Sequence, residues 1–401
     1  MAERIYETDS HARTCTARVL SCTEAPGGYD LIMDRTAFFP EAGGQPCDLG
    51  MIGAVRVLHV RQSGDEIIHR CDHALPMGQE VCLSIDWARR FDYMQQHTGE
   101  HLLSHAADRL FGAHNIGFHL AEADYTTIDF DRPLSPEELQ AAQCMANELI
   151  WRGLAVRADF YDSAEALAEL PLRKQTEGLA PPIRVVSIED ADMCTCCAPH
   201  CRHSGEVGML LITDAVAYKG GTRVFFVCGG RALDYAVRAH GALDGLARRF
   251  SCKRAEVCAH VDKLFSDYAE ARRSERALTD TLNEHLAAAL RVNAEQIGGK
   301  RLMLELYNGV DAARLKPIAQ AALEPKALCV LLSITGGKLA YAAASAEGFT
   351  PDAEEIIQAV NAATGGKGGG RNGLAQGMAP SIAGTAETLE QLRRYFRQRL
   401  A

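Results

Sequence analysis

The stretch from about Ala255 to Leu290 contains neither proline nor glycine, and it constrains the fold of this chain more than any other feature. Apolar side chains recur there at alternating spacings of four and three residues, broken only at Glu275: Val257, Val261, Leu264, Tyr268, Ala271, Leu278 and Leu282. Both observations predict one long helix with a coiled-coil stripe. The stripe fits packing on the helix's own domain about as well as a homodimer seam, because about three or four heptads are the least that indicate a seam.

The parts of the chain before and after this stretch differ in charge. The 401 residues carry a net charge of −10, but the segment from Gly298 onward holds 12 Lys and Arg against 9 Asp and Glu, a charge of +3, which leaves −13 for the rest. A general nucleic-acid coat needs clustered cations, so the overall charge argues against that class and singles out the C-terminal part. The length predicts about two to four domains.

The N-terminal residues and the cysteines indicate the cellular compartment of this protein. MAERIYETDS lacks the basic and apolar regions of a signal peptide, and the longest apolar run, ALCVLLSI, is far shorter than the roughly 20 residues of a membrane span. We therefore expect a cytoplasmic protein with no membrane partner. In a reducing cytoplasm the 14 cysteines do not form a disulfide framework, so a dense cluster of them indicates metal binding or redox chemistry.

Strand and helix patterns organise the chain before the long stretch. Short strand-like segments between Gly, Pro and Asp turns fill about the first ninety residues and predict a small β-barrel. Helical spacing then runs from Arg89 to Gly112. A second helix begins at Ser135, where SPEE offers an N-cap and a capping box, and ends near Gly153. Further strand-like runs such as YTTIDF and IRVVSI make this a mixed α+β region.

Two pairs of metal-ligating side chains carry the strongest chemical signal. His97 and His101 are four residues apart on the predicted helix, so both imidazoles leave the same face. In DMCTCCAPHCRHSGEVG, Cys196 and His200 have the same spacing. One thiolate and three imidazoles form a ligand set that zinc prefers in tetrahedral geometry. HxxxH alone more often reflects solvated histidines, but the second cluster favours a metal site. Four neighbours remain rival ligands: Cys194, Cys197, Cys201 and His203.

Several segments together resemble one family. HTGEH, CCAPH and SGEVG resemble the editing domain of alanyl-tRNA synthetases and of free-standing alanyl-tRNA editing proteins, whose zinc motifs are HxxxH and CxxxH. TAFFPEAGGQPCDLG is similar to a segment of the family's N-terminal barrel, and GGKGGGRNGLAQG to the glycine-rich signature of its DHHA1 domain. The motifs follow the family's order over nearly the whole chain, and nothing looks like an aminoacylation core. The chain thus resembles the long free-standing editing form.

The resemblance implies an α+β protein and a function. The implied parts are a small β-barrel (1–88), a zinc-binding editing domain (89–248), a long helical, coiled-coil-like linker (249–297) and a C-terminal α/β DHHA1-like domain (298–401). Zinc would be held by His97, His101, Cys196 and His200. The implied activity is hydrolysis of seryl-tRNA(Ala), and the sequence leaves open whether glycyl-tRNA(Ala) is also a substrate. The family is also associated with ATP binding.

Thr36 and Gln45, in the barrel motif, are the predicted catalytic residues. An alanine pocket rejects serine poorly, because one added hydroxyl costs little in a small apolar site, so a second hydrolytic site is needed. Its ester substrate is labile, and the enzyme mainly has to position a water and stabilise an oxyanion. We expect the Thr36 hydroxyl to bond the serine hydroxyl, although Thr36 fits an ordinary strand equally well. Gly43 and Gly44 would admit the ligand near Gln45, or form a tight turn.

A glycine run distinguishes the α/β unit that follows Ile297. We expect a loop whose backbone N–H groups and two cations hold a phosphate or ribose edge of tRNA, or else a flexible connection. Its residues are Lys367, Gly368, Gly369, Gly370 and Arg371. A predicted helix from Thr350 precedes the run where a dinucleotide site needs a strand, which argues against a GxGxxG fingerprint.

Two other functions compete with the editing hydrolase. A metallopeptidase would need the glutamate of HExxH, and Glu100 lies at the wrong position of the motif. A non-catalytic tRNA-binding or regulatory protein would use zinc only as a structural ion. The sequence leaves the role of zinc open: four protein ligands close the site, whereas a labile ligand would allow an activated water.

Overall fold

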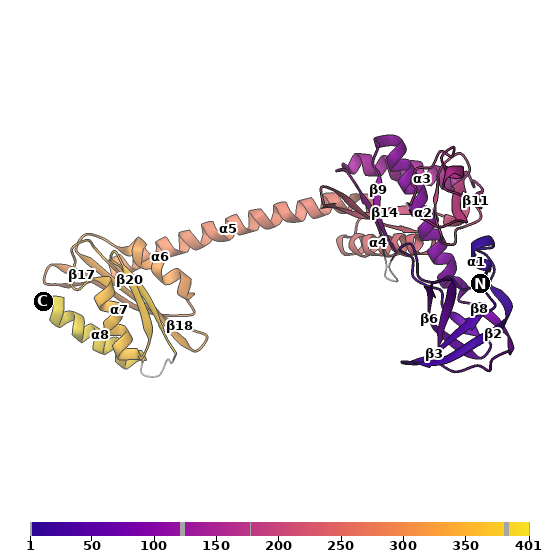
Figure 1. Ribbon diagram of the computed structural model, residues 1–401. Helices are drawn as coiled ribbons and strands as arrows, with labels where there is room; N and C mark the ends of the chain where they lie inside the picture. Colours follow the sequence, from indigo (N-terminus) through magenta and orange to yellow (C-terminus); the bar gives the residue numbers. More distant parts are fainter. Residues whose placement is uncertain (1, 121–124, 177, 381–384, 401) are drawn as a thin grey trace. The chain divides into compact units, whose positions relative to one another are not determined.

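The computed structural model describes residues 2–120, 125–176, 178–380 and 385–400. Its contacts divide the chain into two compact units, Met1–Arg249 and Phe250–Ala401 (Figure 1). Both units contain helices and sheets, which confirms the α+β class. The finer division into four domains stays a prediction. None of the helices in the described part of the chain combines the length and apolarity that crossing a bilayer requires.

The first unit begins with a closed barrel whose strand order is β2-β3-β7-β6-β5-β8. Strand β8 shows why these segments form it: Val81, Leu83 and Ile85 point inward and alternate with exposed neighbours. The strands are β2 (Thr14–Ala25), β3 (Gly28–Met33), β5 (Gly50–Ile52), β6 (Val55–Ser63), β7 (Glu66–Cys71) and β8 (Glu80–Ile85). Beside the barrel lie α1 (Ile5–Thr8) and the parallel pair β1 (Glu3–Arg4) and β4 (Arg35–Thr36).

Two helices cover a four-stranded sheet in the rest of this unit. The sheet has the order β14-β15-β10-β9, and α2 and α3 share a hydrophobic core with it. A second sheet has the order β11-β12-β13. The bounds are α2 (Trp87–Phe111), β9 (Asn115–Leu120), β10 (Thr126–Phe130), α3 (Pro136–Trp151), β11 (Val156–Tyr161), η1 (Glu165–Leu167), β12 (Ile183–Ile188), β13 (Met193–Thr195), η2 (Ser204–Val207), β14 (Leu210–Tyr218), β15 (Gly221–Cys228) and α4 (Gly229–Phe250).

The helix ends of this region follow the sequence signals. Gly112 ends α2 in the left-handed conformation, with φ of 62°, which glycine adopts without strain. Ser135 accepts a hydrogen bond from the Glu138 backbone N–H, and the Glu138 side chain accepts one from the Ser135 N–H. The predicted capping box of α3 is therefore confirmed.

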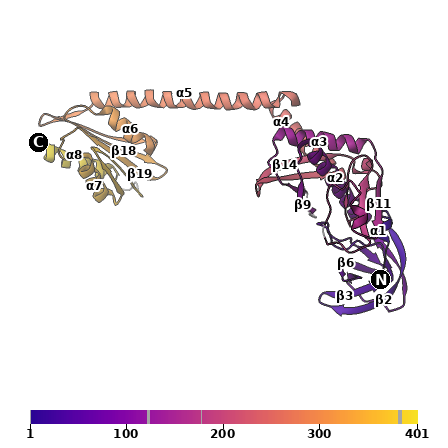
Figure 2. The same ribbon diagram turned by 45° about the horizontal axis from the view of Figure 1, so that its top comes forward.

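The second unit is a six-stranded sheet with helices on both faces (Figure 2). Strand β18 explains the layers: Leu328, Val330 and Leu332 pack with α7 and α8, while Cys329 and Leu331 pack with α6 and the end of α5. The sheet order is β16-β17-β18-β19-β21-β20. The bounds are η3 (Arg254–Glu256), α5 (Val257–Val292), β16 (Glu295–Ile297), β17 (Lys300–Asn308), α6 (Ala312–Ala322), β18 (Ala327–Thr335), β19 (Lys338–Ser345), α7 (Ala353–Thr364), β20 (Lys367–Arg371), β21 (Leu374–Ala379) and α8 (Thr385–Leu400).

Helix α5 is continuous over nearly the whole stretch that lacks proline and glycine. Its last turns are anchored, because Ala287 and Leu290 are buried against α6. The middle of the apolar stripe is open: Leu264 is 55% exposed, Tyr268 63% and Leu278 71%. A homodimer seam along this stripe stays a prediction.

The glycine run forms a strand, so the predicted loop is wrong. Residues Lys367–Arg371 are β20, an edge strand that pairs antiparallel with β21. Asn372 and Gly373 connect them with φ of 54° and 70°, the two-residue hairpin turn for which Asn-Gly is the strongest local signal. A Cβ atom at Gly368 or Gly370 would collide with the β21 backbone. Close approach of two strands therefore accounts for these two glycines.

A buried ion pair joins the barrel segment to α2. The Arg90 Nε donates to Asp48 at 3.0 Å, and both side chains are fully buried. The guanidinium also donates to the Ser10 carbonyl at 2.9 Å and to the Ala37 carbonyl at 2.6 Å. Asp48 and the two carbonyls thus accept hydrogen bonds from the Arg90 guanidinium in a place that excludes water.

We expect Arg90→Met to lower the free energy of unfolding of the first unit by about 3–5 kcal/mol, because Asp48 becomes an unpaired buried charge. Urea titration followed by tryptophan fluorescence measures this, since the two tryptophans, Trp87 and Trp151, both lie in that unit. The exposed pair of Arg18 and Glu80 provides the control, for which Arg18→Met should cost at most about 1 kcal/mol. Equal losses in the two variants would contradict the assigned role of the buried pair.

Candidate functional site

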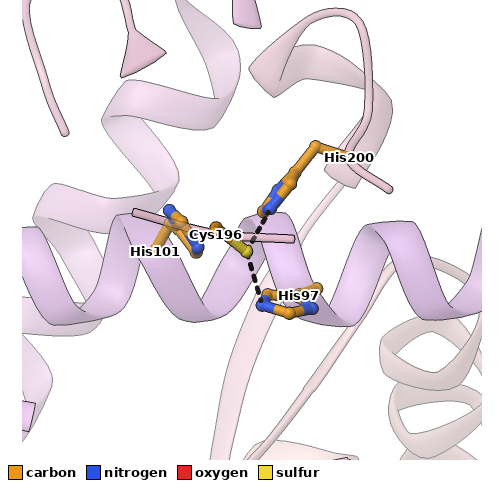
Figure 3. A group of neighbouring side chains, drawn as sticks. All are labelled: His97, His101, Cys196 and His200. Carbon is orange, nitrogen blue, oxygen red and sulfur yellow. Dashed lines mark hydrogen bonds between the residues drawn. The ribbon is translucent and has the colours of Figure 1, made fainter. Parts of the chain in front are cut away.

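The four predicted metal ligands come from two segments of the first unit. His97 and His101 lie one turn apart on α2, and Cys196 and His200 lie in the loop between β13 and η2. One ligand atom from each side chain lies within 4.8 Å of the other three. Figure 3 shows the Cys196 sulfur between the His97 and His200 rings, at 3.6 Å and 3.3 Å from their Nε2 atoms. The structure thus brings all four residues together.

Each of the three imidazoles has a hydrogen-bond partner at its other nitrogen. Nδ1 of His97 lies 2.9 Å from Gln45 Oε1, and Nδ1 of His101 lies 3.0 Å from Asp192 Oδ2. Both oxygens are acceptors, so Nδ1 carries the proton in these pairs. Nδ1 of His200 lies 3.1 Å from Thr98 Oγ1, which can accept in the same way. Such partners fix the tautomer that leaves the Nε2 lone pairs available to a metal ion.

The thiol pKa is shifted in opposite directions at Cys196 and at its neighbour Cys194. Burial raises the pKa of the Cys196 thiol, but His97 and His200 lower it more, so the pKa lies well below its usual value. Burial lowers the pKa of His200 to about 3. Burial is also the largest influence on Cys194, and it raises the pKa of that thiol. These directions favour the thiolate form at Cys196 over that at Cys194.

The rival ligands lie outside the four-residue group. Cys194 approaches His101 Nδ1 at 3.5 Å and forms with His101 and Asp192 a second, overlapping group. Cys197 and His203 are exposed, and Cys201 is buried next to Thr98. Neither of the candidate metal groups in the described part of the first unit includes these last three residues.

Asp192 and Arg173 hold the His101 ring in place, and neither residue was predicted from the sequence. Arg173 donates two hydrogen bonds to Asp192, at 2.6 Å and 2.9 Å, while Asp192 faces His101. Burial raises the pKa of Asp192, but His101 and Arg173 lower it more, so this carboxylate stays charged. Burial lowers the pKa of His101, whereas Cys194 and Asp192 raise it well above its usual value. The higher pKa favours the protonated His101 ring, and a metal ion bound at Nε2 would displace the proton from that nitrogen.

A cavity of about 830 Å³ opens beside the four ligands. His97, His101 and Cys196 line it together with cations and with aromatic and proline side chains, among them Arg4, Lys174, Arg184, Phe118, Phe160 and Pro182. Glu100, the misplaced glutamate of the peptidase motif, also lines the cavity. Its Oε1 accepts hydrogen bonds from Ser104 and Asn115, both at 2.5 Å. The cavity can hold a small polar group with an attached ring system.

The Gly43–Gly44 segment is a tight turn that carries Gln45 to His97. Ala42 and Gln45 exchange backbone hydrogen bonds, and the two glycines between them have φ of 58° and 78°. A Cβ atom at Gly44 would lie 2.6 Å from the Phe118 carbonyl oxygen, whereas Gly43 lines the cavity. Gln45 is 1% exposed, and its Nε2 has no hydrogen-bond partner among the described residues. Gln45 is not among the residues that line the cavity, so the structure brings this amide against His97 rather than to the cavity wall.

Thr36 lies in the barrel core with its hydroxyl already engaged. His69 Nδ1 is 3.2 Å from the Leu31 carbonyl, so its Nε2 accepts the hydrogen bond from Thr36 Oγ1 at 2.8 Å. The Phe38 N–H donates to the same hydroxyl oxygen at 3.0 Å. Burial lowers the pKa of His69 to about 4 and keeps this ring neutral. Thr36 is fully buried and is not among the residues that line the cavity.

Lys367 and Arg371 lie in the second unit, at the two ends of β20. Both are exposed, and they flank glycines that belong to an edge strand. An edge strand leaves alternate backbone groups unpaired, and these can meet a ligand. The Gly368 carbonyl already accepts a hydrogen bond from Asn361 at 3.1 Å.

Two domain families match this chain. Residues 183–224 match the Threonyl and Alanyl tRNA synthetase second additional domain, a range that contains Cys196 and His200. Residues 298–401 match the DHHA1 domain, which contains the glycine strand.

Relatives with similar sequences cover most of the chain. Alanyl-tRNA editing protein Aarsd1 of Bos taurus is 32% identical over 73% of this chain and 69% of the bovine protein. The protein of the same name in Mus musculus is 29% identical over 98% of this chain and 97% of its own length. Alanine–tRNA ligase of Pyrococcus abyssi is 27% identical over 97% of this chain, but this match spans 43% of the ligase. The chain therefore belongs to the alanyl-tRNA editing protein family.

Proposed function

We propose that this chain is a zinc-dependent hydrolase that removes serine from mischarged tRNA(Ala). Glycyl-tRNA(Ala) would be a further substrate. The observation that carries the proposal is the group of one thiolate and three imidazoles at the wall of an 830 Å³ cavity. Family membership supports it, because the relatives' names describe alanyl-tRNA editing. An ester substrate suits this site, since a labile bond needs a positioned water more than a strong base.

The donor set fits zinc. His97, His101 and His200 would offer Nε2, and Cys196 would offer its thiolate, the soft sulfur and imidazole ligands that zinc binds tetrahedrally. Gln45, Asp192 and Thr98 hold the three rings in place, as second partners do in zinc proteins. When bound, zinc would supply positive charge that orders the site and acts as a Lewis acid toward an oxygen of the substrate.

The remaining steps fall to groups of the chain itself. In hydrolysis, water adds to the ester carbonyl, the oxygen gains negative charge, and the ribose hydroxyl leaves with a proton. Gln45 does not line the cavity, so its amide would act through His97, whose ring Gln45 Oε1 holds at 2.9 Å. Arg4 and Lys174 line the cavity and would attract the phosphodiester group next to the aminoacylated ribose of tRNA.

We propose that the C-terminal unit binds the tRNA and that Lys367 and Arg371 contribute phosphate contacts. The segment from Gly298 has a net positive charge on an otherwise acidic chain. The glycines between the two cations would let the sugar-phosphate backbone approach the edge of the sheet. The contacts would raise affinity without reading the mischarged amino acid.

We expect the purified chain to deacylate seryl-tRNA(Ala) and to leave alanyl-tRNA(Ala) largely intact. Cys196→Ala should lower the bound zinc by one ion per chain and abolish deacylation, because the single thiolate of the group is lost. Release of serine from labelled tRNA and elemental analysis of the protein measure the two effects.

Cys197→Ala is the matched control, since this exposed neighbour lies outside the ligand group. If Cys196→Ala kept its full zinc content and Cys197→Ala lost zinc, the ligand would be Cys197 and not Cys196. Full zinc with no seryl-tRNA(Ala) hydrolysis in the unaltered chain would favour the non-catalytic alternative.

We expect Thr36→Val to reduce the preference for seryl over alanyl ester by about 1–3 kcal/mol if its hydroxyl bonds the substrate serine. The variant should also lower the free energy of unfolding, because His69 Nε2 and the Phe38 N–H lose their partner. The ratio of kcat/KM for the two esters and a urea titration separate the effects. Lower stability with an unchanged ratio would assign Thr36 to the barrel core alone.

We expect the double variant Lys367→Gln and Arg371→Gln to raise KM for seryl-tRNA(Ala) with little change in kcat, because the hydrolytic groups lie in the other unit. The dependence of log KM on log salt should flatten by about 0.7–0.9 for each lost phosphate contact. Lys338→Gln removes an exposed cation from another hairpin of the same unit and serves as the control. A double variant with the KM and salt slope of the control would show that this strand does not bind tRNA.

A further inference from the structure

Three potential metal ligands converge at the start of α5 in the second unit. Cys252 precedes η3, Glu256 is its last residue, and His260 lies in the first turn of α5. One ligand atom from each lies within 4.8 Å of the other two. Glu256 and His260 are four residues apart, so their side chains leave the same side of the helical segment, and Cys252 lies just before it. None of them belongs to the group that contains His97, and they lie in the second unit.

Local contacts hold two of the three side chains in place. The Lys253 backbone N–H donates to Glu256 Oε2 at 3.0 Å, which turns the carboxylate back toward the residues before the helix. The His260 ring stacks on Phe250, with centroids 5.8 Å apart and planes at 29°. Ser251, with φ of 53°, forms a turn directly before Cys252, whose side chain lies close to those of Glu256 and His260. Partners that orient a ligand before metal arrives reduce the entropy lost on binding.

We propose that Cys252, Glu256 and His260 form a second zinc site. A thiolate, an imidazole and a carboxylate are all zinc ligands, with bond lengths of about 2.0–2.3 Å. Ligand atoms around a tetrahedral zinc ion lie roughly 3.5 Å apart, so modest side-chain rotations close the observed group around an ion. Cys252 and His260 are half-buried and Glu256 is exposed, so an ion can enter from solvent and a water completes the coordination.

The second zinc ion would fasten the chain before α5 to the first turns of that helix. Cys252 lies outside the helix, whereas Glu256 and His260 lie within the helical segment, so one ion joins both parts. Metal ligands at this spacing stabilise the helical conformation that brings them together. The site therefore acts on local order at the beginning of the second unit, and deacylation does not require it.

Zinc titration of the full chain, stripped with a chelator, tests the proposal. We expect two zinc ions per chain, and one in either Cys252→Ser or His260→Ala. Glu256→Gln keeps the side-chain shape and should weaken the second binding event by at least about tenfold. Cys258→Ser is the matched control, because Cys258 is exposed on the same helix and lies outside the group. Cobalt in place of zinc should give a thiolate charge-transfer band that Cys196→Ala retains in part and Cys196→Ala with Cys252→Ser lacks.

Hydrogen exchange gives a readout that is independent of the ion count. Zinc should slow amide exchange in the first turns of α5 in the unaltered chain and in Cys258→Ser, but not in Cys252→Ser. Seryl-tRNA(Ala) hydrolysis should be unchanged in Cys252→Ser, so failure of the editing proposal and failure of this one give different results. Equal zinc affinity and stoichiometry in Cys252→Ser, His260→Ala and Cys258→Ser would overturn the second site.

Discussion

The rest of the first unit depends on the buried ion pair between Arg90 and Asp48. Arg90 lies near the start of α2, the helix that carries His97 and His101, and Asp48 follows the turn that presents Gln45. Because both charges are fully buried, neither segment can shift without exposing an unpaired charge to an apolar surrounding. The same guanidinium holds the Ser10 carbonyl, and the Ser10 hydroxyl donates to the His200 carbonyl at 2.7 Å. The ion pair thus links the segment after the glycine turn to the helix that carries His97 and His101.

The candidate metal centre is assembled from parts that are distant in sequence. Gln45 comes from the barrel segment, Thr98 from α2, and Asp192 from the turn between β12 and β13. Each meets one histidine, so the order of the site rests on three separate tertiary contacts. These contacts orient the three candidate ligand rings beside the cavity, because each ring is held by a partner from another part of the unit.

Local signals determined much of the secondary structure and of the ligand set. The HxxxH spacing, the SPEE capping box and the run without proline or glycine each act within one or two turns, and the structure contains the helices they predict. Local reasoning was wrong about the glycine run, because Asn372-Gly373 begins a hairpin whose partner strand lies only a few residues later. It also left α4 unassigned, a helix that contains four glycines, and glycine within a helical pattern weakens the prediction of a helix.

By itself, the sequence determined the α+β class, the family and four side chains that suit zinc, since these follow from spacing and residue type. Only the tertiary structure showed which cysteine lies between imidazoles, because His97 on α2 and His200 in the following loop both approach Cys196. It also revealed Asp192 and Arg173 and placed the Thr36 hydroxyl against His69. Protonation and hydrogen-bond partners depend on burial and on distances between atoms, and those are set when segments far apart in the chain pack together.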